Sequence, residues 1–215
     1  MESRSHFSFS RHRLEKKMKT RTVTRTLVLV ALMLNLGVAG VYAQQNPIKM
    51  TFSGTNVATT INLQPGTVTD DVNLAGDGSL GPFTFRELRA DNLTPQQPPT
   101  TCSTPLFFRA EIAAGVLRFQ DGSLLVINLV KLPEGPEAGI CIDLAAGMAR
   151  LTETYEITRG TKRLKRASGT LTLTATVIPV LFNAAGGAQF LTSTGKFEGT
   201  ISGAAIGEDG PDERK

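Results

Sequence analysis

Two side chains that could do chemistry together, Glu153 and Tyr155, stand two residues apart in the segment 149–158. Apolar and polar residues alternate along this segment, which predicts a β-strand with one face made of Leu151, Glu153, Tyr155 and Ile157. If that face is the interior of the fold, a carboxylate lies beside the only tyrosine of the predicted mature chain. Such a pair could bind a ligand or act as an acid or base.

A structural role for Glu153 is the alternative. Its carboxylate could lie near the rim of a barrel, where water solvates it, or it could form an ion pair with an arginine such as Arg86 or Arg109. Either arrangement would satisfy the charge without any ligand.

A second candidate site is the basic turn that follows this strand. The segment 159–166 carries four cations in one predicted turn: Lys162, Arg163, Lys165 and Arg166. They could contact phosphate, anionic polysaccharide or lipid head groups. The alternative is a solvated loop in which only Leu164 packs inward.

The chain has two cysteines, Cys102 and Cys141. In an exported protein, two cysteines most simply form one disulfide, here closing a loop of about 39 residues. A pair of reactive or metal-binding thiols is the alternative. The sequence has no C-x-x-C spacing and no histidine after the predicted leader, so we expect neither a metal site nor a cofactor.

The first 43 residues have the layout of an export signal. A basic stretch precedes the apolar run 26–43, which closes on Val41-Tyr42-Ala43 and makes Gln44 the predicted mature N-terminus. The leader resembles those of bacterial exported proteins, and its true start could be Met18. An uncleaved membrane anchor is the alternative for the run 26–43. We therefore expect a secreted or periplasmic protein with no stable membrane span after cleavage.

Removing this leader changes the composition and limits the chemistry. It holds 8 of the 23 Lys and Arg residues and 2 of the 19 Asp and Glu residues, so the formal charge falls from +4 to −2. Nucleic acid is therefore not an expected partner. Both histidines lie in the leader, which excludes His-dependent triads and His as general acid or base from the mature chain.

The rest of the sequence alternates with a period of two residues, which is typical of antiparallel strands. The inward-facing sets that we expect are Ile48, Met50 and Phe52; Phe83 and Phe85; Phe108, Ala110 and Ile112; Leu171, Leu173, Ala175 and Val177; and Phe197 and Ile201. Turns are expected at Gly54-Thr55-Asn56, Pro65-Gly66, Gly76-Asp77-Gly78, Asp121-Gly122, Gly160, Gly186-Gly187 and Gly195.

Two long surface loops and a tail complete the expected organisation. The segments 88–105 and 132–139 are rich in proline and polar residues, and each lies next to one cysteine. The segment 207–215 is charged and lacks large apolar residues, so we expect a disordered tail. The expected barrel domain spans 44–206.

The stretch 155–171, YEITRGTKRLKRASGTL, resembles the Y-x-I-x-G-G-T-G-[RK]-F-x-x-A-x-G-x-[LV] segment of secreted barrels of the dirigent and allene-oxide-cyclase type. The segment 195–203 is similar to the closing strand of bacterial exported proteins that share it. Arg159 and Lys162 replace two glycines of the pattern, and Leu164 replaces its phenylalanine. The resemblance implies a barrel fold, but no segment matches the family's catalytic positions.

We therefore predict an all-β protein, a single antiparallel β-barrel of about eight main strands, with a β-sandwich as the alternative. An outer-membrane barrel is disfavoured by strands expected to run only about five to ten residues, by the low aromatic content and by the charged tail. The expected function is binding of a small apolar or amphipathic ligand, or a structural role in the envelope. A cyclase or isomerase without histidine is one alternative, and an adhesion or matrix protein that contacts an anionic surface is another.

Overall fold

The computed structural model describes residues 45–131 and 137–204; the predicted signal segment, 1–43, and the predicted tail, 207–215, lie outside them. Within these ranges the chain forms nine strands and one 3-10 helix: β1 (Asn46–Thr59), β2 (Thr67–Gly78), β3 (Phe83–Asn92), β4 (Leu106–Phe119), β5 (Leu124–Leu129), β6 (Gly139–Asp143), β7 (Met148–Gly160), η1 (Lys162–Leu164), β8 (Ser168–Phe182) and β9 (Ala188–Ser202).

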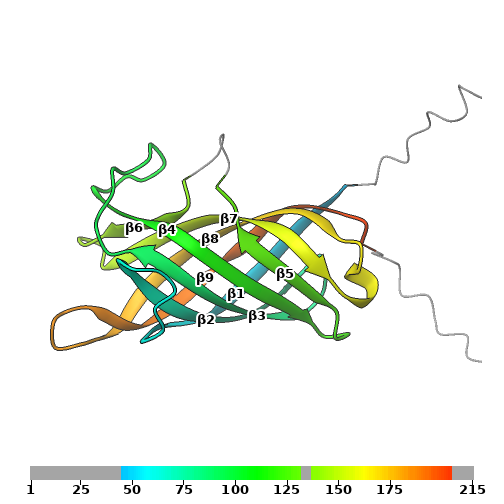
Figure 1. Cartoon of the computed structure of the whole chain (residues 1–215), viewed down its shortest axis with the longest axis horizontal. Coiled ribbons are helices and arrows are strands. Elements are labelled where there is room, and N and C mark those ends of the chain that lie inside the picture. The colour runs from blue at the N-terminus through cyan, green and yellow to red at the C-terminus, as the bar shows by residue number, and fades with distance from the viewer. Residues whose placement is uncertain (1–44, 132–136, 205–215) are drawn as a thin grey trace, which may run out of the picture. The chain divides into compact units, whose positions relative to one another are not determined.

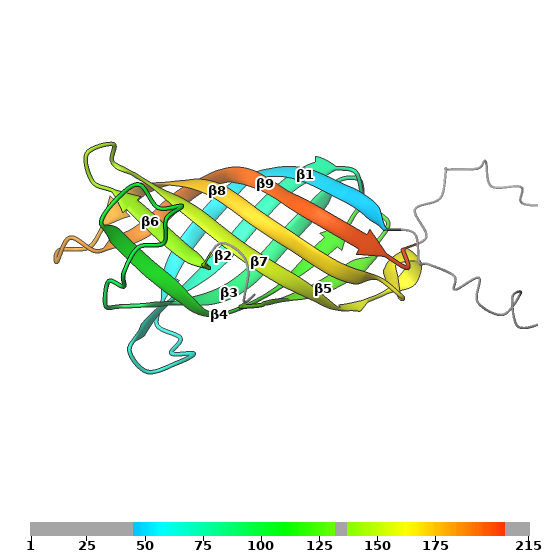
Figure 2. The same ribbon diagram turned by 90° about the horizontal axis from the view of Figure 1, so that it is seen from above.

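The strands close into an antiparallel barrel, which confirms the predicted fold class. Neighbours pair in the order β3-β2-β1-β9-β8-β7-β5-β4, and the pairing of β3 with β4 closes the ring. Figure 1 and Figure 2 show the tilted strands wrapping around one axis. The sandwich alternative is wrong, because a closed ring has no separate facing sheets.

The ninth strand, β6, shares one position in the wall with β5. Both lie between β4 and β7: β5 pairs with the segments 114–118 and 155–160, and β6 pairs with 106–109 and 148–152. The two strands run in the same direction and lie one after the other along this part of the wall.

Apolar side chains fill the interior. Phe85 lies at the centre, with its ring 5.2 Å from that of Phe197 and 6.5 Å from that of Tyr155. The outward positions carry mostly hydroxyls and charges, as in the row Thr170, Thr172, Thr174 and Thr176 of β8. This apolar-in, polar-out alternation is the reverse of that in a transmembrane barrel.

The strands are longer than expected, and three predicted turns lie inside them. β1, β4, β8 and β9 have 14 or 15 residues each. Gly54 lies within β1, where a Cβ would come within 2.1 Å of the Asn73 carbonyl oxygen. Gly76 within β2 and Gly195 within β9 lie equally close to a neighbouring backbone. These glycines allow neighbouring backbones to approach closely in a tightly curved wall, so they do not mark turns here.

Two further expectations about the strands were wrong. β3 runs to Asn92, so the first long loop spans only 93–105, and Arg89 and Asp91 belong to a strand. The set Phe108, Ala110 and Ile112 does not keep one face, because the register of β4 against β3 shifts by one residue beside Ala90. This bulge leaves Ile112 exposed.

The barrel has two different ends. The plugged end carries the turns 79–82 and 120–123 and the helix η1, whose Leu164 is fully buried together with Leu80. The loop end carries the segments 60–66, 93–105, 144–147 and 183–187. In Figure 1 the loop end lies at the left and the plugged end at the right.

Candidate functional sites

The structure brings Glu153 and Tyr155 together in the barrel interior, on the face of β7 that the alternation predicts. Both side chains have no exposed surface, and Leu151 and Ile157 are buried beside them. The Tyr155 hydroxyl lies 2.6 Å from Glu153 Oε2 and 2.5 Å from Glu87 Oε1 on β3. Because a phenol has one proton to donate, a proton on one of the two carboxyls must supply the other hydrogen bond.

Glu153 pairs with an arginine, but neither Arg86 nor Arg109 is its partner. Arg89 Nη1 lies 3.6 Å from Glu153 Oε1, and Arg89 also donates from Nη2 to Asp91 Oδ2 at 2.5 Å. Arg89 has 1% of its surface exposed. The sequence-based prediction missed Arg89 and Asp91 because it assigned both to a surface loop. The alternation of Phe83 and Phe85, continued along the chain, would have placed both side chains inside the barrel.

Burial controls the protonation of this cluster, formed by Glu87, Arg89, Asp91, Glu153 and Tyr155. Burial raises the pKa of Asp91 to about 6, although the Arg89 guanidinium lowers it. Burial, and then the charge of Glu153, raise the pKa of the Glu87 carboxyl well above its usual range. Burial likewise raises the pKa of the Tyr155 phenol. The Glu87 and Asp91 carboxyls therefore keep their protons to a higher pH than they would in water.

This buried cluster connects β3 with β7 across the barrel. Two of its oxygens, Asp91 Oδ1 and Glu153 Oε1, accept no hydrogen bond from the described residues. Glu153 and Tyr155 have no surface exposed to solvent. A ligand could reach the pair only by displacing packed side chains, so the geometry fits a polar contact that fixes strand register.

The basic turn is built around a structural arginine. Arg163 donates from Nε to Asp121 Oδ2 at 2.6 Å and from Nη2 to the Leu80 carbonyl at 2.6 Å, and it lies over the Phe119 ring. Lys162 donates from Nζ to the Asp121 carbonyl. It adopts a φ of 49°, at the position where the barrel pattern quoted above has a glycine.

Lys162, Lys165 and Arg166 are exposed, and no described residue forms an ion pair with Lys165 or Arg166. The structure thus separates the four predicted anion-binding residues into two that hold the turn by hydrogen bonds, Lys162 and Arg163, and two that have no such contact. Leu164 packs inward, as the alternative interpretation of this segment expected.

The two cysteines are joined. The Cα atoms of Cys102 and Cys141 lie 5.8 Å apart, as in a disulfide, and the bond ties the loop 93–105 to the outer face of β6. Such a bond fits an extracytoplasmic, oxidising compartment.

A groove of about 550 Å³ lies on the outer wall beneath this tethered loop. Its floor follows neighbouring strands in register: Thr51 of β1 pairs with Lys196 of β9, Lys196 with Thr174 of β8, and Thr174 with Thr152 of β7. A second row joins Thr194, Thr176, Arg150 and Cys141. The loop supplies one wall with Pro99, Thr101, Ser103 and Thr104.

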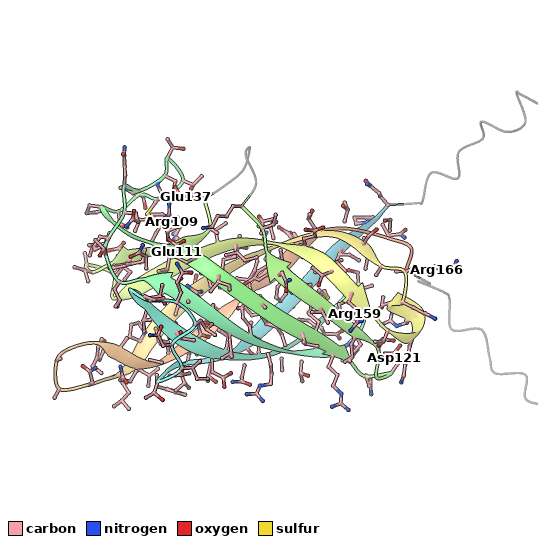
Figure 3. All side chains as sticks on the ribbon, in the orientation of Figure 1. Arg109, Glu111, Asp121, Glu137, Arg159 and Arg166 are labelled. Atoms are coloured by element: carbon pink, nitrogen blue, oxygen red, sulfur yellow. A yellow bond between two sulfur atoms is a disulfide. The ribbon has the colours of Figure 1, made fainter. Side chains whose placement is uncertain are left out.

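Some charged side chains in this groove have ion-pair partners among the described residues and others do not. Lys196 forms an ion pair with Glu198 at 2.6 Å, and Glu137 lies 3.9 Å from Arg109, which is itself held by Glu111. Figure 3 shows Arg109, Glu111 and Glu137 together near the loop end, far from Asp121, Arg159 and Arg166.

Arg150 is the exception in the groove. Its side chain is exposed, and it has no hydrogen bond or ion pair within residues 45–131 and 137–204. The sequence signal for it was weak, because an arginine on the outer face of a strand is ordinarily a solvated residue.

No protein-family model, curated protein sequence or solved structure matches this chain significantly. Within the described ranges, no three or more His, Cys, Asp and Glu side chains form a group that could hold a metal ion. Those ranges also hold no helix with the length and hydropathy needed to cross a bilayer.

Proposed function

We propose that this chain is an exported binding protein that uses its filled barrel as a rigid scaffold and holds a small anionic ligand in the outer groove. One observation carries the proposal: Arg150 has no partner among the described residues and lies among hydroxyl side chains, beneath a loop that a disulfide fixes in place. A guanidinium in such a position is suited to a carboxylate or phosphate, and the threonine rows can bond to further hydroxyls.

Acidic sugars combine both kinds of group and are the ligand class that we propose. The groove volume of about 550 Å³ is within the ordinary range for small-molecule sites. The ligand of the proposal is thus small, as the sequence suggested, but it lies outside the barrel and away from Glu153 and Tyr155.

The export of the chain and its relationship to known barrels are part of the same proposal. We propose that residues 1–43 direct export and are removed before Gln44, because the disulfide suits an oxidising compartment. We also propose a remote relationship to the dirigent and allene-oxide-cyclase barrels, supported by the eight-stranded ring. A cyclase activity is less well supported, since it would need an open interior.

Calorimetry with a galacturonate trimer tests the ligand class. We expect binding by the wild-type protein and binding weakened by about tenfold or more in Arg150→Gln, because a charge-assisted hydrogen bond is lost. The neutral methyl ester of the trimer is the matched ligand, and Lys165→Gln, at the plugged end, is the matched variant. Equal affinity for the acid and its ester would contradict the role of Arg150.

A further inference from the structure

The hairpin that joins β8 to β9 extends beyond the barrel wall at the loop end. β8 loses its β7 partner after Val177, which pairs with Ala149, but it continues to Phe182. Beyond that point only β9 accompanies it. Figure 1 and Figure 2 both show this hairpin, in orange, projecting past the neighbouring strands.

The projecting part of β8 is apolar and exposed. Ile178, Val180, Leu181 and Phe182 are 48%, 56%, 60% and 55% exposed. Soluble monomeric surfaces rarely collect large apolar side chains in a continuous run, and such runs mark sites of interaction.

Charge is absent from the tip of this hairpin and from the tip of its neighbour. No Asp, Glu, Lys, Arg or His occurs between Arg166 and Lys196, although 20% of the whole chain is charged. The β1–β2 hairpin, at the same end, has none between Lys49 and Asp70 and exposes Ile61 and Leu63. The pairing of Val57 with Phe190 connects the two hairpins.

We propose that the uncharged tips of these two hairpins form a docking surface that inserts into the lipid of a membrane surface. Neither tip carries a charge, so no charged side chain has to leave water when the tips enter an apolar lipid layer. The exposed apolar side chains of the tips gain free energy by this transfer. The proposal concerns residues other than those that line the acidic-sugar groove and does not depend on that groove.

A second copy of the chain is the alternative occupant, since one of its strands could pair with the free edge of β8. Two features of that edge disfavour such pairing. Pro179 has no N–H to donate, and the register of β8 against β9 shifts between Pro179 and Leu181. Both features interrupt the regular row of hydrogen bonds that an added strand requires.

The absence of tryptophan from the chain gives a direct test. In Phe182→Trp protein recovered from the extracytoplasmic fraction, we expect the emission to shift to the blue when phosphatidylcholine vesicles are added. The shift should persist in about 0.5 M salt, because no charge is involved. Val116→Trp, at an exposed apolar position on β4 outside both hairpins, should show no shift.

A second variant measures the strength of the contact. Leu181→Asp in the Phe182→Trp background should weaken vesicle binding by about tenfold or more, since a charge must then enter the apolar layer. Vesicle flotation of the wild-type protein gives an answer even if this variant does not fold. Three results would overturn the proposal: no flotation, binding that requires anionic lipid, or a blue shift without vesicles that rises with protein concentration, which would indicate a second copy.

Discussion

Arg89 is the one positively charged side chain buried inside the described barrel, and it shares that space with Glu87, Asp91 and Glu153. One cation cannot balance three carboxylates in a medium that solvates charge poorly, so protons must remain on some of them. The shared hydrogen bonds of Tyr155 with Glu87 and Glu153 agree with this, since they require a protonated carboxyl. The contact between β3 and β7 inside the barrel therefore includes protonated carboxyl groups.

This protonation predicts a dependence of stability on pH. Burial raises the pKa of Asp91 from 3.8 to about 6, so the folded state binds a proton that the unfolded state has released. The stabilisation is complete below the unfolded pKa and is lost as pH rises through about 6. We expect a loss on the order of 1–3 kcal/mol between acidic and neutral pH from this group.

Urea unfolding of wild-type protein and Asp91→Asn at several pH values between about 4 and 8 measures this effect. The Asn variant should lose less stability over that range, whereas Glu156→Gln, at an exposed position of β7, should behave as the wild type does. Parallel pH profiles for Asp91→Asn and wild type would show that Asp91 is charged throughout.

At the scale of the strands, alternation predicted most of the barrel from the sequence. Periods of two residues identified the inner face of β7 and β8, since apolar and polar positions there follow the pleat without interruption. The extent of β3 was missed because Glu87, Arg89 and Asp91 interrupt the apolar pattern, although they face inward. Glu87 and Arg89 have partners on β7, more than sixty residues away, and no local pattern records those contacts.

Thr154 shows where the outer face of β7 departs from the expected surface. It points outward as predicted but is only 6% exposed, because its hydroxyl lies 3.2 Å from that of Thr172 and its carbonyl accepts from Val130 as the chain leaves β5. We therefore expect Thr154→Ala to lower the free energy of unfolding by about 1–2 kcal/mol. Glu156→Ala, two residues along on the same face and exposed, should cost less than about 0.5 kcal/mol. Equal small effects in chemical denaturation would mean that Thr154 is solvated.

The turn around η1 contains one cation that holds the structure, Arg163, and another that is solvated, Lys165. Arg163→Ala should lower the free energy of unfolding by about 1–3 kcal/mol, because it removes the donors to Asp121 and to the Leu80 carbonyl. Lys165→Ala, in the same turn, should change stability by less than about 0.5 kcal/mol. Thermal unfolding of the two variants compares them, and a larger loss for Lys165→Ala would reverse these roles.

At the scale of the whole molecule, the disulfide connects the barrel wall to the loop that forms one side of the groove. The Cys102–Cys141 bond is the covalent link between the loop 93–105 and the wall, and this loop forms one side of the groove. The sequence predicted the bond from the cysteine count and the predicted export. It could not predict the groove, because the residues of its floor come from five different strands.

Removing this bond should act on both stability and binding. Cys102→Ser should lower the free energy of unfolding by roughly 3–4 kcal/mol, the amount expected for a loop of this length. It should also weaken binding of the galacturonate trimer, because the loop would lose its attachment to β6. Thiol labelling of the unfolded wild-type protein without reductant should find no free cysteine, and two labelled thiols would refute the pairing.

The central claim is that the barrel is filled and that its ligand binds outside it. Amide chemical-shift mapping by NMR during titration with the galacturonate trimer tests it most directly. We predict shifts for Arg150, Thr152 and Thr174, which line the groove. The amides of Glu87 and Tyr155, whose side chains are buried inside the barrel, should stay unchanged. Shifts at Glu87 and Tyr155 without shifts at Arg150 would place the ligand inside the barrel and contradict the claim.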